Sequence, residues 1–365
     1  MRQTIVLFLL PLLSACTTPR EAFDQQDFDK AYKLALADLN KGKGGKEEQT
    51  ILQQSLENIL ARDVAESRSL SATEKPEDWK AALDINYGLQ EKIKEARAFL
   101  PGAFEKELYT LPQQAAWLRK KLYAHYFEQG KDNLARTAAT GLKAYAQQAH
   151  GAFSKAYTYA DPPTAELDSL SRVALKKGIV YYTVTTEAPF DVTYNWEINQ
   201  VFSRLEDQSG GFLRIAFNDP LRNADCAIEI RFSSLEIDIR EETGDEDFNR
   251  EVILEYQTVT DTAGNKTQVP VYGTVEGNVY IITRTKTVTW EADVRVNALT
   301  PNCSVSSENF EASAQSVARE VRTSGDERAI PEEYLDAPKE QFIEEDDMVE
   351  QILEDLYEQI VRAYF

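Results

Sequence analysis

The sequence predicts an α+β protein with repeat-like (TPR-like) helical hairpins at its N-terminus, followed by a mostly antiparallel β domain covered by a C-terminal amphipathic helix. Apolar residues recur every three or four positions over residues 24–177, which is the period of one helix face. From Gly178 the period becomes two, and β-branched and aromatic residues become frequent, which indicates strands. The last twenty residues return to a helical period. We therefore expect two units that meet near residues 177–178.

The first helices are marked by their ends. In "DFDKAYKLALADLNKGKGG" a helical pattern starts near Asp27, and a glycine cluster at 42–45 ends it. The stretch "EEQTILQQSLENILARDVAESRSL" repeats this period, and Pro76 is placed to begin the next helix because proline suits the first helical turn.

One stretch, "AAWLRKKLYAHYFEQGKDNLARTAATGLKAYAQ", predicts a helical hairpin. Leu122, Tyr126, Gly130 and Ala135 have spacings of four, four and five, which resemble the core of a tetratricopeptide repeat. The resemblance implies large residues on a first helix, a turn at Gly130, and a small residue, Ala135, on the second helix. The terminal proline of that repeat is missing, and Tyr123 stands where a small residue is usual.

The β half opens with "GIVYYTVTT" and "GGFLRIAF", both rich in strand-forming residues. In "CAIEIRFSSLEIDIR" the apolar residues occupy even positions before residues 233–234 and odd positions after them, so that Leu235, Ile237 and Ile239 are expected to face inward. A slip of one residue predicts a β-bulge or a bend between sheets. Further on, "REVILEYQTV" and "TDTAGNKTQVPVYGTV" predict an extended hairpin that turns at 261–265.

Two long elements complete the β half. The stretch "NVYIITRTKTVTWEADVRV" alternates in the manner of a half-buried antiparallel strand. The final stretch, "EEDDMVEQILEDLYEQIVRAYF", has two adjacent apolar rows at helical spacing, and acidic residues at its start suit the positive end of a helix. We expect this helix to pack on the sheet.

The first fifteen residues have the order of a secretory signal. Arg2 precedes an apolar run that is too short to span a membrane, and small residues follow the run. Leu13-Ser14-Ala15-Cys16 resembles the bacterial lipobox, which implies cleavage before Cys16 and acylation of its thiol. An ordinary signal peptide with an incidental cysteine is the alternative.

The lipobox resemblance also predicts a location, and together with the change of period it gives the domain bounds. Thr17 stands where an aspartate favours the inner membrane in Gram-negative lipoproteins, so we expect a periplasm-facing lipid anchor in the outer membrane. The predicted segments are a signal peptide at 1–15, a lipidated tether at 16–23, a helical domain at 24–177 and a β domain at 178–365.

The chain is strongly acidic. The formal charge of the 365 residues is −21, and loss of Arg2 with the signal makes it −22. This charge argues against nucleic acid as a partner, because phosphates are bound by Lys and Arg. It also argues against binding flat on anionic lipid.

Two cysteines remain once Cys16 is assigned to lipid. Cys226 and Cys303 form an even pair in an oxidising compartment, which predicts a disulfide. Two buried free thiols are the alternative.

No residue pattern predicts catalysis. His125 and His150 are the two histidines, and neither has a second histidine or a cysteine at ligand spacing, which argues against zinc. The acidic stretch "EETGDEDFNRE" at 241–251 lacks the ordered spacing of an EF-hand, and we expect a solvated loop there. We therefore expect no catalytic residue, metal or cofactor, although an enzyme with an unfamiliar site stays open.

Several stretches together resemble one protein family. "DPPTAELDSLSRVALKKGIVYY", "VPVYGTV", "SGDERAIP" and "DMVEQILEDL" are similar to outer-membrane lipoproteins of Bacteroidota that have a helical repeat-like half and a β-rich half. The resemblance implies this architecture and a lipid anchor, and it implies no activity for any residue.

These observations favour a non-enzymatic scaffold for protein interactions in an outer-membrane assembly. The chain would attach to the membrane through acylated Cys16 and bind an envelope protein, with its oligomeric state left open. The alternative is a glycan- or peptidoglycan-binding lipoprotein that uses aromatic residues of the β domain: Tyr181, Tyr182, Tyr194, Trp196 and Trp290.

Overall fold

The computed structural model describes residues 18–189, 193–219, 221, 223–260 and 266–365. The chain divides into two compact units, one ending at Lys177 and one beginning at Gly178. Cys16, the signal peptide and the hairpin turn expected at 261–265 lie outside the described residues. The two units together confirm the predicted α+β class, with helices first, a mostly antiparallel sheet second and a helix at the C-terminus.

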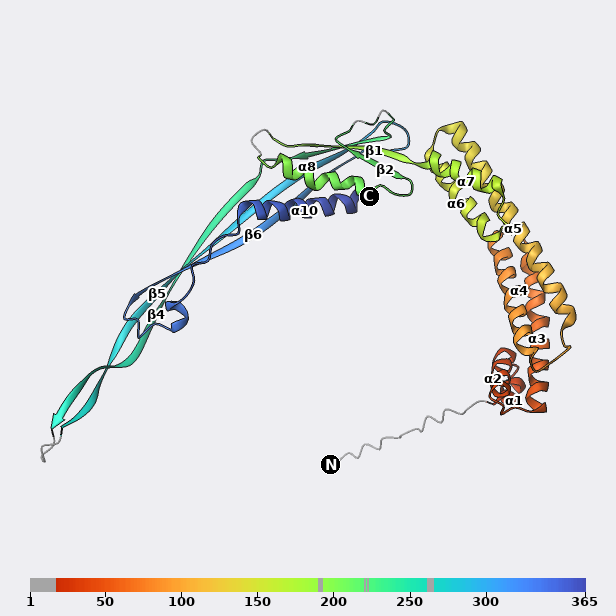
Figure 1. Cartoon of the computed structure of the whole chain (residues 1–365), viewed down its shortest axis with the longest axis horizontal. Helices are drawn as coiled ribbons and strands as arrows, with labels where there is room; N and C mark the ends of the chain where they lie inside the picture. Colours follow the sequence, from red (N-terminus) through yellow and green to blue (C-terminus); the bar gives the residue numbers. More distant parts are fainter. Residues whose placement is uncertain (1–17, 190–192, 220, 222, 261–265) are drawn as a thin grey trace, which may run out of the picture. The chain divides into compact units, whose positions relative to one another are not determined.

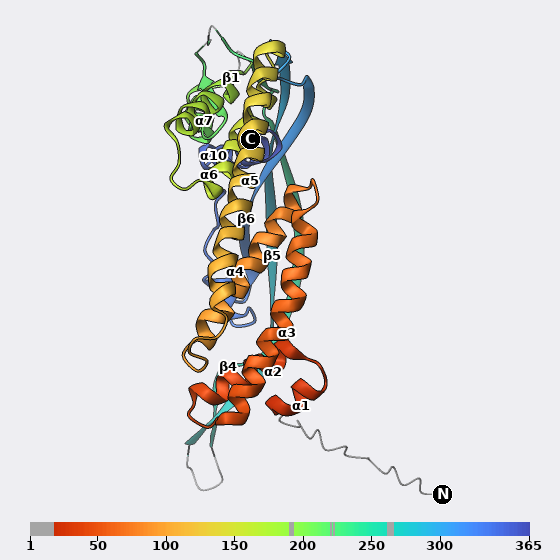
Figure 2. The same ribbon diagram turned by 90° about the vertical axis from the view of Figure 1, so that its right-hand side faces the viewer.

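The described part of the first unit is helical throughout. Its helices are α1 Pro19–Asp24, α2 Phe28–Asn40, α3 Lys46–Ser71, α4 Pro76–Ala96, α5 Glu105–Thr140, α6 Lys143–Tyr159 and α7 Ala165–Gly178, of which the last residue belongs to the second unit. Helices α3, α4 and α5 run side by side along much of their length (Figure 2). Asp27 caps α2 and Pro76 opens α4, as the sequence predicts.

Residues 19–23 were expected to form part of a tether, and this expectation is wrong. Thr18 and Glu21 form a reciprocal capping box in which each side chain accepts from the other residue's backbone N–H. Ala22 of the same helix is fully buried against α2 and α3. The capping box satisfies two backbone donors at the helix start, so a short helix forms where the sequence showed no apolar period.

The repeat-like turn at Gly130 is also wrong. Helix α5 is unbroken from Glu105 to Thr140, and the chain turns only at Gly141, whose φ is +73°. Leu122, Tyr126, Gly130 and Ala135 therefore lie on one helix, with Ala135 exposed. A single glycine costs a helix only about 1 kcal/mol, so good helix formers on both sides carry the helix through it.

Gly130 has a packing role in place of a turn. A Cβ at this position would lie 2.6 Å from Cδ1 and 2.7 Å from Cζ of Phe153, which is fully buried on α6. The absence of a side chain therefore lets α6 pack closely on α5. Gly88 in α4 offers the opposite environment, because a Cβ there would have no atom within 4 Å.

We predict that Gly130→Ala lowers the free energy of unfolding by about 1–3 kcal/mol, because the added methyl overpacks the Phe153 site. The matched control Gly88→Ala should raise it by about 0.5–1 kcal/mol, since it removes glycine entropy without a clash. Urea unfolding followed by circular dichroism measures both. Equal effects of the two substitutions would contradict the packing role.

The second unit contains a six-stranded sheet among its described residues, in the order β2-β1-β3-β5-β4 with β6 on the other edge of β5. Its elements are β1 Val180–Glu187, α8 Asn195–Ser203, the 3₁₀ helix η1 Arg204–Gln208, β2 Leu213–Phe217, β3 Cys226–Phe232, β4 Glu236–Thr260, β5 Lys266–Ala298, β6 Ser306–Gly325, α9 Glu332–Leu335 and α10 Glu345–Tyr364. Strand β1 pairs in parallel with β2 and β3, and the other pairs are antiparallel.

At the phase slip predicted for 233–234, the segment that joins β3 to β4 has one residue more than the part of β5 opposite it. Phe232 pairs with Ala292, and Glu236 pairs with Thr289, so four steps on one strand match three on the other. This is the count of a β-bulge. The burial expected for Ile237 and Ile239 is wrong, because both belong to β4 at the edge of the sheet and are exposed.

The core of the second unit lies between the sheet and two helices. Helices α8 and α10 lie side by side over the sheet (Figure 1). Trp290 on β5, Phe202 on α8 and Leu353 on α10 are fully buried in this core. The predicted packing of the final helix on the sheet is confirmed.

The β4–β5 pair continues beyond this core as a two-stranded ribbon (Figure 1). Strand β6 accompanies β5 only from Val296 to Gly277, so residues 266–276 of β5 pair with β4 alone. The acidic stretch 241–251, expected as a loop, lies within β4. The stretch forms a strand because its backbone pairs continuously with β5. This pairing does not depend on the charge of side chains that point into water.

Candidate functional site

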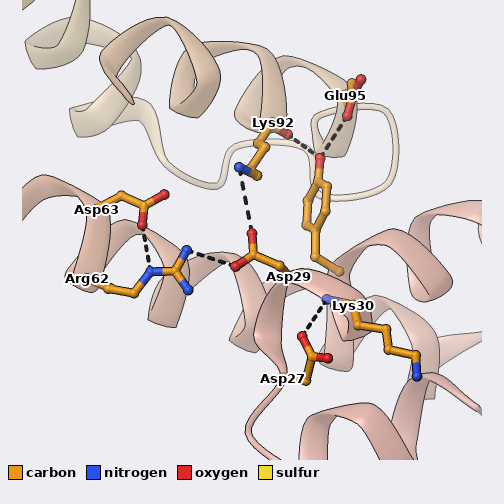
Figure 3. Close-up of polar contacts among 8 residues, drawn as sticks. Asp27, Asp29, Lys30, Arg62, Asp63, Lys92 and Glu95 are labelled. Carbon is orange, nitrogen blue, oxygen red and sulfur yellow. Dashed lines mark hydrogen bonds and ion pairs between the residues drawn. The ribbon is translucent and has the colours of Figure 1, made fainter. Parts of the chain in front are cut away.

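A polar network joins α2 to α3 and α4 in the helical unit (Figure 3). The Tyr32 hydroxyl donates to the backbone oxygen of Lys92 at 2.8 Å and lies 3.1 Å from a carboxylate oxygen of Glu95. Burial raises the pKa of Tyr32 above its ordinary value, and the neighbouring Glu95 raises it further. Tyr32 therefore stays a neutral donor that fixes α2 against α4.

Asp29 of α2 links the same helices by charge. Its carboxylate lies 2.8 Å from Nη2 of Arg62 on α3 and 3.8 Å from Nζ of Lys92 on α4 (Figure 3). Arg62 also contacts Asp63 at 2.7 Å, and hydrogen bonds to Asp63 and then Asp29 raise the pKa of the guanidinium. Exposed pairs of this kind contribute little stability singly, so their main effect is to set the orientation of α3 and α4.

Helices α3 and α5 enclose a groove on one side of α4. It consists of two cavities, of 390 and 310 Å³, that share Arg68 as a wall. The first is lined mainly by apolar residues: Leu60, Ala61, Val64, Ala65 and Phe104, with Glu57 and Glu107. The second, which we call the polar cavity, has more polar residues in its lining: Ser67, Ser71 and Gln114 beside Asn86, together with Ala72, Trp117 and Leu118. We call the two cavities together the α3–α5 groove.

Asn86 forms the floor of the polar cavity. Its side chain is 1% exposed, and its Nδ2 donates to Ser67 Oγ and to the Ala82 backbone oxygen, each at 2.8 Å. Its Oδ1 is buried, and no residue that the structure describes donates a hydrogen bond to it. The Ala82 contact fixes the amide orientation, because a carbonyl can only accept. A buried acceptor without a donor costs about 1–3 kcal/mol of stability.

Lys121 closes one end of the groove. Its Nζ donates to the Ser71 backbone oxygen at 3.1 Å, which caps the last turn of α3. The same Nζ lies 3.9 Å from the ring centre of Trp79 and 5.1 Å from that of Trp117. Lys121 therefore places a positive charge beside the indole of Trp117, half of whose surface is exposed.

A further cavity of 430 Å³ lies between α5 and the end of α6. Several of its polar groups contact one another: Arg119 contacts the Asp161 carboxylate at 3.4 Å and the Ala160 oxygen at 3.3 Å, and Tyr123 lies 3.5 Å from Thr164 Oγ1.

The predicted site residues of the helical unit do not form a site. Leu122 is fully buried in the core, and Tyr126 stacks on Tyr159 with ring centres 5.9 Å apart. His125 lies edge-on to Trp79 at 5.7 Å and to Tyr126, which is a packing role. In the described part of the chain, no group of three or more His, Cys, Asp or Glu residues is placed to hold a metal.

Cys226 and Cys303 are brought together in the second unit and form a disulfide, with their Cα atoms 5.6 Å apart. Cys226 is the first residue of β3, and Cys303 lies in the loop between β5 and β6. A buried residue that the sequence did not reveal, Asp225, holds this loop: it accepts from Thr300 Oγ1 at 2.8 Å and from the Tyr181 backbone N–H at 2.9 Å. The carboxylate thus ties the loop to the strand beside the disulfide.

The aromatic residues of the β domain mostly serve the core. Trp290 is fully buried and donates to the Ser233 oxygen at 2.9 Å. Tyr194 packs on Trp290 and donates to Asp346, and burial together with Asp346 and Glu345 raises its pKa to about 12. Tyr182 packs on Phe365, whereas Trp196 is 69% exposed. This arrangement gives the glycan-binding alternative little shared aromatic surface.

Comparison with known proteins gives little further information. No protein-family model matches the sequence, and a search of curated proteins finds no match. A solved structure of a minor lipoprotein from Acinetobacter baumannii shares 14% identity, covering 50% of this chain and 90% of that chain, with a TM-score of 0.17. This similarity is too weak to support an argument. The resemblance to Bacteroidota lipoproteins stays a prediction. Among the described helices, none is both long and apolar enough to span a bilayer.

We predict that the disulfide contributes roughly 4 kcal/mol to the stability of the second unit, because it closes a loop with a sequence separation of 77. Mass spectrometry of the non-reduced protein should find the peptides of Cys226 and Cys303 joined. Reduction, or Cys226→Ala with Cys303→Ala, should lower the unfolding midpoint of this unit. Complete alkylation of both thiols without reductant would contradict the pairing.

Proposed function

We propose that this chain is a lipid-anchored, non-enzymatic scaffold of an outer-membrane assembly, and that its β4–β5 ribbon binds an envelope protein. The observation that supports the proposal best is the uncovered apolar surface of the ribbon. A two-stranded hairpin is at best marginally stable alone in water, and soluble proteins rarely leave apolar side chains gathered without a cover. A partner that covers these side chains would stabilise the hairpin and bury its apolar surface.

Both faces of the ribbon carry apolar side chains. Ile253 pairs with Tyr272, and Tyr256 pairs with Pro270, so these four residues share one face. Tyr256 and Tyr272 are each 58% exposed. The opposite face carries Val269, Val259 and the bulged Leu254, whose side chain occupies the space above Gly273. A partner could therefore enclose the ribbon from two sides.

The charge of β4 favours a protein over a lipid surface as the partner. Residues 236–255 include nine acidic residues and two arginines. Anionic lipid repels such a strand, whereas a protein can place basic or polar groups opposite these acids. Among the described strands, β4 pairs with β5 alone, so its other edge offers backbone groups for strand addition, which is a recurrent mode of protein recognition.

We predict that Tyr256→Ser combined with Tyr272→Ser lowers recovery of the partner by about tenfold or more, because exposed aromatic anchors commonly carry much of an interface's binding energy. The measurement is quantitative mass spectrometry after crosslinking in cells and affinity purification. Tyr109→Ser is the matched control, since Tyr109 is exposed on a different unit. Undiminished recovery with the ribbon variant would contradict the proposed role of the ribbon.

The anchor is tested separately through the lipobox resemblance. We predict that Cys16→Ser abolishes incorporation of a labelled fatty acid. The variant should either be released from the membrane fraction or keep its signal uncleaved. The measurement is fractionation with metabolic labelling. The control is Cys226→Ala combined with Cys303→Ala, which removes the two other cysteines together and should leave labelling at Cys16 unchanged. Labelling that persists in the Cys16 variant would refute lipidation at this residue.

A further inference from the structure

We infer that the α3–α5 groove binds an extended peptide segment that donates a backbone N–H to Asn86 Oδ1 and places a carboxylate on Arg68. This inference goes beyond the proposed function, because it concerns a separate surface in the helical unit and a ligand of defined chemistry. Its support comes from the shape of the groove, from two unused polar groups and from one exposed indole ring.

The dimensions of the groove suit an extended chain. Its α3 wall runs from Glu57 to Ala72, and its α5 wall runs in the same direction from Phe104 to Leu118. At 1.5 Å per residue, fifteen helical residues span about 22 Å. An extended peptide rises about 3.3 Å per residue, so about six or seven residues would fill this length. The two adjoining cavities, of 390 and 310 Å³, therefore make one elongated site, which suits an extended chain.

Asn86 identifies the kind of group that the ligand must present. Its Oδ1 is a buried acceptor that no described residue satisfies, although Nδ2 of the same amide has two partners. The ligand must therefore bring an N–H or O–H donor to the floor of the groove. A peptide backbone supplies such a donor at every residue except proline.

Arg68 identifies the charge of the ligand. Its guanidinium has no ion pair or side-chain hydrogen bond with any described residue, and it borders both cavities. Glu57 and Glu107 line only the first cavity, and the Glu57 carboxylate accepts from Gln53 Nε2 at 2.9 Å. Guanidinium groups bind carboxylates through two parallel hydrogen bonds, so an acidic group of the peptide fits this position.

Trp117 provides the apolar contact at the polar end. Trp117 is 52% exposed, and Nζ of Lys121 lies 5.1 Å from its ring centre. An exposed indole can pack against a side chain of the peptide, and its two side-chain torsions keep the entropic cost of ordering it low. At the other end, Val64, Ala65 and Phe104 offer an apolar surface for further side chains.

The test uses the full chain in nanodiscs and a library of random heptapeptides, immobilised through their N-termini and made with either a free carboxylic acid or an amide at the C-terminus. Selected peptides are then measured singly by fluorescence anisotropy. We expect Arg68→Gln and Trp117→Ala each to weaken binding by about tenfold, and Arg68→Lys to weaken it less. Asn86→Leu, which keeps a similar volume, should weaken it at least as much as Arg68→Gln.

Matched controls separate the groove from general effects. Arg97→Gln and Tyr109→Ala change exposed residues of the same type outside the groove, and the peptide affinity should not change. The ribbon variant with Tyr256→Ser and Tyr272→Ser should bind the peptides normally, so failure of the ribbon proposal and failure of this inference are distinguishable. If Asn86→Leu does not fold, the exposed positions Arg68 and Trp117 still decide the matter.

The two libraries identify the source of the carboxylate. Binding that needs the free acid form indicates a chain terminus, and binding of amidated peptides enriched in Asp or Glu indicates an acidic side chain. Absence of binding peptides in both libraries would overturn the inference. So would selected peptides that lack any carboxylate, or affinities that the Arg68, Asn86 and Trp117 variants leave unchanged.

Discussion

Strand β5 sets the organisation of the second unit, because every other part of its antiparallel sheet pairs with this one strand of 33 residues. Strands β3 and β4 share one of its edges, and β6 takes the other. Helices α8 and α10 are far shorter than β5 and cover only the part that contains Trp290. Where this cover ends, the alternation of β5 no longer produces a core, and the same strand pattern produces a ribbon with apolar side chains in water.

In the helical unit, two buried polar side chains differ in how far the fold satisfies their hydrogen-bonding groups. Tyr32 and Asn86 are both almost fully buried on helices that pack together. The Tyr32 hydroxyl is satisfied by α4, so it serves the fold. The Nδ2 donors of Asn86 are satisfied, whereas no described residue donates to its Oδ1. This contrast is one basis of the peptide site that we infer in the α3–α5 groove.

Much of the local structure could be predicted from single residues. Asp27 and Pro76 determine helix starts through hydrogen bonding and a fixed φ, and the odd-even slip at 233–234 predicts a bulge because each strand residue alternates sides. The candidate groove could not be predicted in this way. Arg68 and Trp117 are almost fifty residues apart and meet only because α4 returns the chain between them.

The sequence by itself determined the α+β class, the change of period near residue 178, the final amphipathic helix and the pairing candidates Cys226 and Cys303. Only the tertiary structure decided which apolar faces are covered. Gly130 serves close packing of Phe153 in place of a turn, and Ile237 and Ile239 stay exposed because β4 lies at an edge that none of the described helices covers. The physical reason is that periodicity records which side of an element is apolar, whereas burial depends on distant residues that come to lie against that side.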